Sequence, residues 1–224
     1  MRKRVVILIS GSGSNMLALL DAVEAQQINA DIAAVISNQA DAAGLQKAAA
    51  RGIHTEILPH KHFPDRAVFD QELIKLINSY QPDLVVLAGF MRILTPEFVT
   101  HFAGKLLNIH PSLLPKYRGL HTHQRALDAG DNEHGCSIHF VTAELDGGPV
   151  VAQARVPVFT DDTAASLAQR VQIAEHQLYP LCVQWFCSGE LQADSNNATL
   201  NGLPLPAEGI QFRLNHANTL EKLA

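Results

Sequence analysis

Short apolar segments alternate with amphipathic helical segments along the first half of the chain. Strands are predicted over residues 5–9, 32–37, 53–58, 84–88 and 106–109. Between them, apolar positions spaced three and four apart predict helices over residues 15–25, 42–51, 65–79 and 96–102. This alternation is typical of a parallel sheet with helices on both faces, so the sequence predicts a doubly wound α/β fold.

The pattern changes in the second half of the chain. A helix over residues 122–129 precedes two strands, 137–142 and 150–158, which a glycine-rich turn joins. The segment Asp161-Asp162-Thr163 is a helix-start signal, and apolar positions at helical spacing follow it. A long amphipathic helix is therefore predicted over residues 163–186.

The final segment carries one turn signal. Asn201-Gly202 predicts a small β-hairpin, and a polar tail without a recognisable motif follows residue 207. We therefore predict a main domain over residues 1–188, with a hairpin and tail over residues 189–224 packed on it or trailing from it. The expected fold is α/β, with a mostly parallel sheet and an antiparallel carboxyl-terminal extension.

Composition and charge narrow the function classes. The chain has 224 residues, of which 47% are hydrophobic and 17% charged, which is typical of a folded globular protein. The formal net charge of -5 offers no basic surface for nucleic acid. The apolar run at residues 5–9 is too short for a signal peptide, and no stretch approaches the ~20 residues of a membrane span. We expect a cytoplasmic protein that binds neither nucleic acid nor a membrane.

Neither disulfides nor metal binding are predicted. The three cysteines match no disulfide framework and no zinc spacing, so reduced and mostly buried thiols are expected at Cys136, Cys182 and Cys187. No carboxylate or cysteine stands at ligand spacing from His121, His123, His134 or His139.

Asn108 and His110 stand two residues apart at the end of the strand predicted over residues 106–109. On a strand, such residues point to the same face, and Pro111 ends the strand because it has no N–H to donate. Polar side chains at the carboxyl end of a strand are where open α/β sheets place their chemistry. From the spacing alone, a hydrogen-bonded structural pair stays the open alternative.

A glycine-rich turn, residues 10–15, follows the first strand and opens the first helix. Its glycines permit a tight turn, and the free N–H groups of a helix start attract phosphate. It does not match the dinucleotide fingerprint, because Met16 stands at the third glycine position and Ser37-Asn38 replaces the acidic residue after the second strand. It also lacks the lysine of a P-loop. The predicted ligand is a monophosphate, and a turn without a ligand is the alternative.

Two further loops are candidates for the site. Residues 88–94 follow the fourth strand, and their apolar side chains suit a flat aromatic ligand, with a plain connection as the alternative. Asp146 lies in a turn before two glycines. A carboxylate beside an imidazole raises its pKa and orients it, although such a segment is more often only a turn.

Together these segments resemble the phosphoribosylglycinamide formyltransferase family, folate-dependent enzymes of purine synthesis. The resemblance spans nearly the whole chain and is carried by residues 9–15, 87–94, 108–117, 119–123 and 139–149. It implies a Rossmann-like formyltransferase fold, with the catalytic domain in residues 1–188. One departure is Arg118, where proline is expected in many relatives and arginine resembles the tRNA-formylating ones.

The resemblance also implies the reaction and its residues. The formyl group of 10-formyltetrahydrofolate, the co-substrate, is transferred to the primary amine of glycinamide ribonucleotide, and no metal is needed. The implied catalytic residues are Asn108, His110 and Asp146. The implied substrate-binding residues are Gly13, Ser14, Asn15 and Glu175. The implied folate-binding residues are Arg66, Met91, Arg92, Ile93, Leu94 and Asn108.

The implied chemistry suits these residue types. As the amine attacks, the formyl oxygen becomes an oxyanion, which a protonated His110 and the Asn108 amide are expected to hold. Asp146 is expected to keep His110 charged and to help move a proton from the amine to the leaving folate nitrogen, through water.

Three alternative functions fit the sequence less well. A methionyl-tRNA formyltransferase is expected to carry a larger carboxyl-terminal domain and a basic surface, whereas here the remainder is short and the net charge negative. A formyltetrahydrofolate hydrolase usually carries an amino-terminal regulatory domain, whereas the first strand here begins almost at Met1. A catalytically silent binding module does not need the three implied catalytic residues. We expect two small-molecule substrates as partners, and either a monomer or a homodimer.

Overall fold

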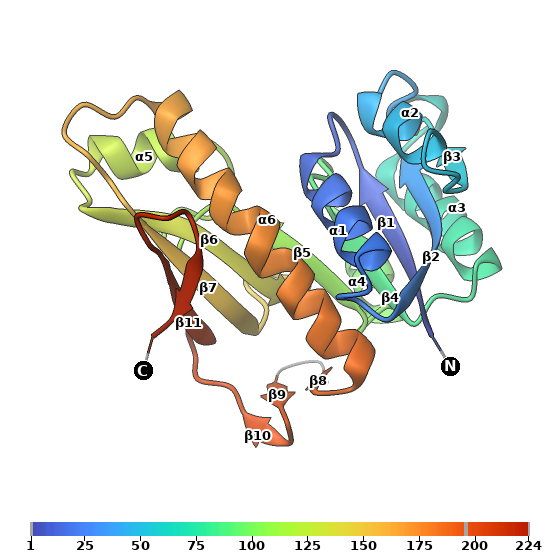
Figure 1. Cartoon of the computed structure of the whole chain (residues 1–224). Helices are drawn as coiled ribbons and strands as arrows, with labels where there is room; N and C mark the ends of the chain where they lie inside the picture. Colours follow the sequence, from blue (N-terminus) through green and yellow to red (C-terminus); the bar gives the residue numbers. More distant parts are fainter. Residues whose placement is uncertain (1, 195–196, 224) are drawn as a thin grey trace.

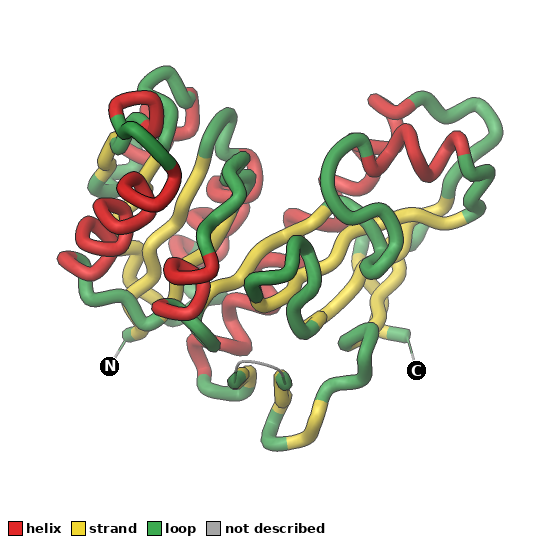
Figure 2. The backbone as a smooth tube through the Cα atoms, turned by 180° about the vertical axis from the view of Figure 1, so that it is seen from behind, coloured by secondary structure: helices red, strands yellow, loops and turns green. Residues whose placement is uncertain are grey.

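A nine-stranded sheet forms the centre of the molecule (Figure 1). The computed structural model describes residues 2–194 and 197–223. The strands follow the spatial order β12-β11-β7-β6-β5-β4-β1-β2-β3. Their bounds in chain order are β1 Lys3–Ile9, β2 Ala30–Ser37, β3 Thr55–Ile57, β4 Leu84–Leu87, β5 Leu106–His110, β6 Glu133–Phe140, β7 Val150–Pro157, β11 Ile210–Leu214 and β12 Leu220–Lys222. In Figure 2 the strands cross the molecule from one side to the other.

Strand pairing changes from parallel to antiparallel after β5. Strands β1 to β5 pair in parallel, whereas β6 pairs antiparallel with both β5 and β7. Strand β11 then pairs in parallel with β7, and β12 pairs antiparallel with β11. The prediction of a mostly parallel, doubly wound sheet with an antiparallel carboxyl-terminal extension is confirmed. Because β1, β4 and β5 are parallel neighbours, the loops after them leave the same edge of the sheet.

Helices cover both faces of the sheet (Figure 1). Their bounds are α1 Ser14–Glu24, α2 Ala43–Ala49, α3 Arg66–Ser79, α4 Pro96–His101, α5 Thr122–Asp128 and α6 Ala164–Ser188, with a short 3₁₀ helix, η1, at His60–His62. Alternate residues of β1 pack into opposite cores. Val5, Ile7 and Ile9 lie in the core that includes residues of α1, α2 and α6, while Val6 and Leu8 lie in the core that includes residues of α3 and α4.

The carboxyl-terminal segment contains more structure than the sequence indicated. Strands β8 Leu191–Ala193, β9 Ala198–Leu200 and β10 Leu203–Pro204 form a small antiparallel sheet. Its predicted hairpin turn is confirmed, because Asn201 and Gly202 have φ of 53° and 77°, as a two-residue hairpin turn requires. We predicted a polar tail after residue 207, and two strands form there instead. Buried Phe212 and Leu214 alternate with Arg213, which is the pattern of a half-buried strand.

Helix α6 begins at a well-formed cap. The Thr163 hydroxyl accepts a hydrogen bond from the Ser166 N–H (3.1 Å), and the Ser166 hydroxyl accepts one from the Thr163 N–H (3.0 Å). The buried Asp162 carboxylate accepts two hydrogen bonds from the Arg170 guanidinium, at 2.7 and 2.8 Å. These bonds hold the pKa of Asp162 well below its usual range. The cap and the ion pair together fix where the helix starts.

We expect Asp162→Asn to destabilise the protein at neutral pH. Losing a hydrogen bond to a charged group costs roughly 1.5–3 kcal/mol in the free energy of unfolding. Because the folded-state pKa of Asp162 is depressed, its contribution is present above the ordinary carboxylate pKa of ~4 and is lost as pH falls further. Urea unfolding of wild type, Asp162→Asn and the exposed control Asp161→Asn, at neutral and acid pH, measures the difference. Equal stability of the two variants at pH 7 contradicts this account.

Candidate active site

The carboxyl end of β5 carries two polar side chains, of which Asn108 contacts a partner on β6. The antiparallel register places His139 directly opposite Asn108. The Asn108 Nδ2 atom lies 3.1 Å from His139 Nε2. His110, at the last position of β5, is only 6% exposed. The sequence placed Asn108 and His110 on one face, and the structure adds His139 to them.

His139 is a neutral hydrogen-bond acceptor for the Asn108 amide. Burial lowers the pKa of His139 to about 4, so its imidazole is uncharged at neutral pH. Its Nδ1–H donates to the Phe140 carbonyl oxygen at 3.1 Å, which leaves the Nε2 lone pair for the Asn108 N–H. The Asn108 amide is thereby oriented, with one Nδ2 hydrogen used and the other free. The sequence assigned His139 no role in the site, because no local motif reveals its place across the strand pair.

Both ring nitrogens of His110 face oxygen atoms. Its Nε2–H donates to the Tyr117 carbonyl oxygen at 2.9 Å, and its Nδ1 lies 3.5 Å from Asp146 Oδ2. The same Asp146 oxygen accepts a hydrogen bond from the Gly119 N–H at 2.9 Å. This geometry accommodates an imidazolium with a proton on each nitrogen. The structure therefore brings the three implied catalytic residues together.

The loop between β6 and β7 must fold back tightly to place Asp146. A Cβ atom at Gly148 would lie 1.8 Å from the Phe140 carbonyl oxygen, so only glycine fits this close approach. Asp146 itself has φ of 48°, a region that aspartate tolerates better than most residues. Arg118 forms an ion pair with Glu144 of this loop. Arg118, the residue that departs from the family pattern, thus connects the loop that orients His110 to the loop that carries Asp146.

Buried side chains of β6 and β7 form hydrogen bonds with the loop after His110. The Leu114 N–H donates to the Ser137 hydroxyl at 3.0 Å, and Gln153 Nε2 donates to the Leu114 carbonyl oxygen at 2.7 Å. These residues carried no signal in the sequence, because a single Ser or Gln in a strand is usually solvent-facing. Their role becomes visible only when strand pairing is known.

The glycine-rich turn opens α1 and meets α6. Gly13 precedes the helix with φ of 72°, and no side chain caps the helix start, so its N–H groups are free to bind an anion. Asn15 Nδ2 donates to Glu175 Oε2 at 2.8 Å, and Gln172 of α6 donates to the Ser14 hydroxyl at 3.1 Å. The structure thus brings the implied phosphate turn together with Glu175. Burial raises the pKa of Glu175.

The implied folate loop is tied to this turn. The Ser10 N–H donates to the Gly89 carbonyl oxygen at 3.1 Å, and the Met91 N–H donates to the Ser10 hydroxyl at 2.8 Å. The Met91 and Ile93 side chains are 71% and 55% exposed, which is unusual for large apolar groups. The Arg92 guanidinium lies 4.5 Å from the centre of the Phe69 ring.

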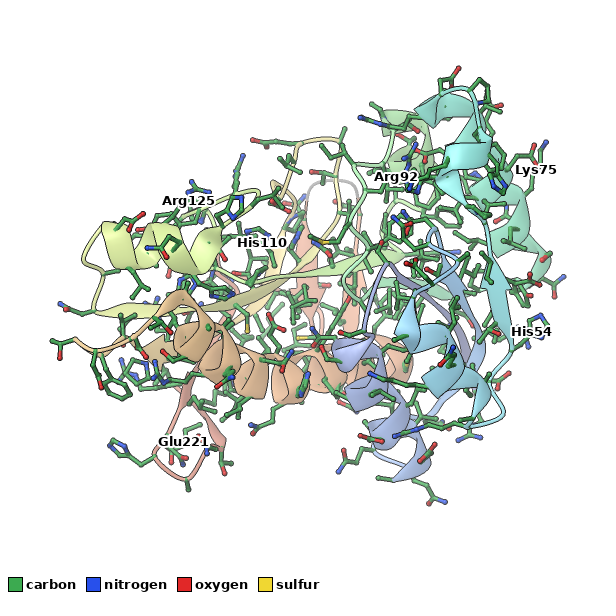
Figure 3. All side chains as sticks on the ribbon, turned by 90° about the horizontal axis from the view of Figure 1, so that it is seen from above. His54, Lys75, Arg92, His110, Arg125 and Glu221 are labelled. Atoms are coloured by element: carbon green, nitrogen blue, oxygen red, sulfur yellow. The ribbon has the colours of Figure 1, made fainter. Side chains whose placement is uncertain are left out.

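Of the other implied folate-binding residues, one lies in this loop and one lies on α3. Leu94 is half-buried in the same loop, whereas Arg66 is exposed at the first turn of α3. Among the described residues, no hydrogen bond or ion pair joins Arg66 to the loop. Seen from above in Figure 3, His110 lies between the labelled Arg92 and Arg125.

The described residues contain neither a metal-binding cluster nor a membrane-spanning helix. Within residues 2–194 and 197–223, no group of three or more His, Cys, Asp or Glu side chains is placed to hold a metal ion. In the same part of the chain, no helix is both long and apolar enough to cross a membrane.

Comparison with known proteins identifies the family. The formyl transferase family model matches residues 3–183. The phosphoribosylglycinamide formyltransferase of Escherichia coli (strain K12) is 56% identical over 205 residues, which are 92% of this chain and 97% of that protein. The chain belongs to the phosphoribosylglycinamide formyltransferase family. It is therefore a formyl transferase enzyme, and the resemblance inferred from its motifs is confirmed.

A solved structure and a longer relative support the same family assignment. The phosphoribosylglycinamide formyltransferase of Coxiella burnetii superimposes with a TM-score of 0.90 at 47% identity, covering 94% of this chain and 99% of that one. The human trifunctional purine biosynthetic protein adenosine-3 is 44% identical over 195 residues, which are 87% of this chain but 19% of that protein. The phosphoribosylglycinamide formyltransferase fold therefore extends over nearly all of this chain.

We expect Glu175→Gln to stabilise the folded protein above acid pH. A raised pKa in the folded state means that the buried carboxylate opposes folding once pH exceeds its ordinary value of ~4.3. The gain should be largest near pH 8 and should fade below that ordinary pKa. Urea unfolding over this pH range, with Glu72→Gln on α3, whose partly exposed side chain pairs with Lys75, as the control, checks the sign. A variant less stable than wild type at pH 8 contradicts the burial argument.

Proposed function

We propose that this chain transfers the formyl group of 10-formyltetrahydrofolate to the amine of N1-(5-phospho-D-ribosyl)glycinamide, in the cytoplasm and as part of purine biosynthesis. The observation that carries the proposal is the contact between His110 and Asp146 beside Asn108, on the sheet edge shared with the helix-start turn. The names of the relatives support the acceptor substrate.

Two donors hold the developing oxyanion. The amine lone pair attacks the formyl carbon, and the formyl oxygen gains negative charge. The free Nδ2 hydrogen of Asn108 is available to it, since His139 takes only the other. We assign His110 Nδ1–H as the second donor, because Nε2 is already bonded to the Tyr117 carbonyl oxygen, whereas Nδ1 lies 3.5 Å from Asp146 and makes no short hydrogen bond to it. Preorganised donors of this kind act only where charge develops, and so they lower the barrier.

Asp146 completes the proton balance. When the tetrahedral intermediate forms, the attacking nitrogen must lose a proton, and the folate nitrogen must gain one as its bond to the formyl carbon breaks. Asp146 faces His110 and is only 10% exposed, so it can hold that proton close to the reacting atoms and return it through water. The reaction needs no covalent enzyme intermediate.

The two substrates occupy adjoining parts of the edge. The N–H groups after Gly13, with Ser14 and Asn15, bind the phosphate group, and Glu175 contacts the same substrate. Met91 to Leu94, with Arg66 and Asn108, bind the folate, with the exposed apolar side chains of the loop against its flat ring. The hydrogen bonds of Ser10 with Gly89 and Met91 hold the phosphate-binding turn and the folate-binding loop in a fixed relative position.

The rival function is hydrolysis of the formyl-folate by water. The buried Asn15–Glu175 pair beside the helix start favours transfer, because a hydrolase needs no polar site for an amine-bearing phosphate ester. A tRNA acceptor is disfavoured by the net charge of -5. Two small molecules are therefore the proposed partners, with a monomer or homodimer as the assembly.

The deciding experiment follows folate turnover by the purified protein with and without glycinamide ribonucleotide. We expect formation of tetrahydrofolate only when the amine is present, with one formylated product for each folate consumed. Turnover that is independent of the amine overturns the transferase in favour of the hydrolase.

We expect His110→Ala to reduce kcat roughly 100- to 1000-fold, the usual effect of removing one oxyanion donor. The matched control is His54→Ala, an exposed histidine at a distance from His110 in Figure 3. Steady-state kinetics of both variants, with urea unfolding to confirm the fold, measure the effect. Retention of most of the activity by His110→Ala removes it from the mechanism.

A further inference from the structure

A buried carboxylate on α3 has no part in the mechanism. Asp70 is 1% exposed, and its Oδ2 accepts one hydrogen bond, from the Thr95 N–H at 2.6 Å. Among the described residues, no group hydrogen-bonds its other oxygen, Oδ1. Burying a carboxylate costs free energy unless its oxygens are paired, so a half-paired one is poorly explained by stability. The position of its single hydrogen bond, to Thr95, indicates its role.

That bond lies where the folate loop turns into α4. Thr95 caps α4, accepting a hydrogen bond from the Phe98 N–H at 3.3 Å. The preceding residue on α3, Phe69, contacts Arg92 of the same loop. Two successive residues of α3 therefore contact the loop. The Phe69 ring packs against the Arg92 guanidinium, and the Asp70 carboxylate accepts a hydrogen bond from the Thr95 N–H.

The loop is clamped at both ends. At its start, Ser10 bonds Gly89 and Met91, and the Ser10 hydroxyl donates in turn to Asn38 Oδ1 at 2.6 Å. At its end, Asp70 bonds Thr95. Between the clamps, the loop keeps large apolar side chains exposed, an arrangement that a free loop would lose by collapsing onto the sheet.

We propose that Asp70 is a positioning residue for folate, whose buried carboxylate fixes the loop of residues 89–95 in the conformation that binds the folate ring. The inference rests on the proposed function of that loop. A loop held in its bound conformation loses less conformational entropy on binding, so the benefit appears in folate affinity and not in the chemical step.

The test compares Asp70→Asn with Asp70→Ala. Asparagine keeps an acceptor oxygen but loses the charge, and a charge-assisted hydrogen bond is about twice as strong as a neutral one. We expect the KM for 10-formyltetrahydrofolate to rise about 3- to 10-fold in Asp70→Asn, and further in Asp70→Ala. The kcat and the KM for the amine substrate stay within about twofold of wild type.

Stability separates this role from a structural one. Because a buried neutral amide costs less than a half-paired carboxylate, the urea midpoint of Asp70→Asn should equal or exceed that of wild type. The matched control is Glu72→Gln, which removes the same charge from the same helix at a side chain paired with Lys75. Its KM values and its stability should stay at the wild-type level.

The outcomes are distinct. A selective rise in the folate KM, with a matching loss of tetrahydrofolate binding by calorimetry, supports the proposal. An equal rise in both KM values, a fall in kcat alone, an unfolded Asp70→Asn, or the same effect from Glu72→Gln overturns it. A wild-type protein that binds tetrahydrofolate but does not formylate the amine overturns the proposed function instead, and the binding comparison still decides the role of Asp70.

Discussion

The arrangement of the whole site depends on β5, which pairs in parallel with β4 and antiparallel with β6. The parallel side brings the helix-start turn after β1 and the loop after β4 to the edge where β5 ends. The antiparallel side places His139 across from Asn108 and leads the chain back through the loop that carries Asp146. One strand thus joins the elements proposed to bind the substrates to those proposed to move the proton.

Helix α6 connects this edge to the rest of the protein. Its cap and the Asp162–Arg170 pair fix its start, and Glu175 reaches the turn before α1. Further along, the fully buried Tyr179 hydroxyl lies 3.0 Å from the carbonyl oxygens of both Leu87, the last residue of β4, and Leu107 of β5. The helix that carries Glu175, the proposed substrate contact, is therefore anchored on β4, which leads into the proposed folate loop, and on β5, which carries Asn108.

Much of the fold and part of the site were predictable from local pattern. The alternation of apolar runs and helical segments predicted strands β1 to β5 and the helices between them, and Asn201-Gly202 predicted its hairpin. Asn108 and His110 were placed together by strand periodicity alone. Strand β11 was missed because its alternation of apolar and polar residues is short and lies in a segment that was assigned as a polar tail. Strand β6 begins at Glu133, ahead of the apolar residues that marked it.

The sequence by itself determined the strands and helices of the first half, the two polar residues at the end of β5 and the glycine turns, because each depends on neighbours within a few residues. Only the tertiary structure decided that His139 is neutral and accepts from Asn108, that the Tyr117 carbonyl orients His110, and that Asp70 accepts a hydrogen bond from Thr95 at the end of the proposed folate loop. These contacts join residues on different elements, and burial sets their charge states. Neither strand pairing across the sheet nor desolvation leaves a mark on the local sequence.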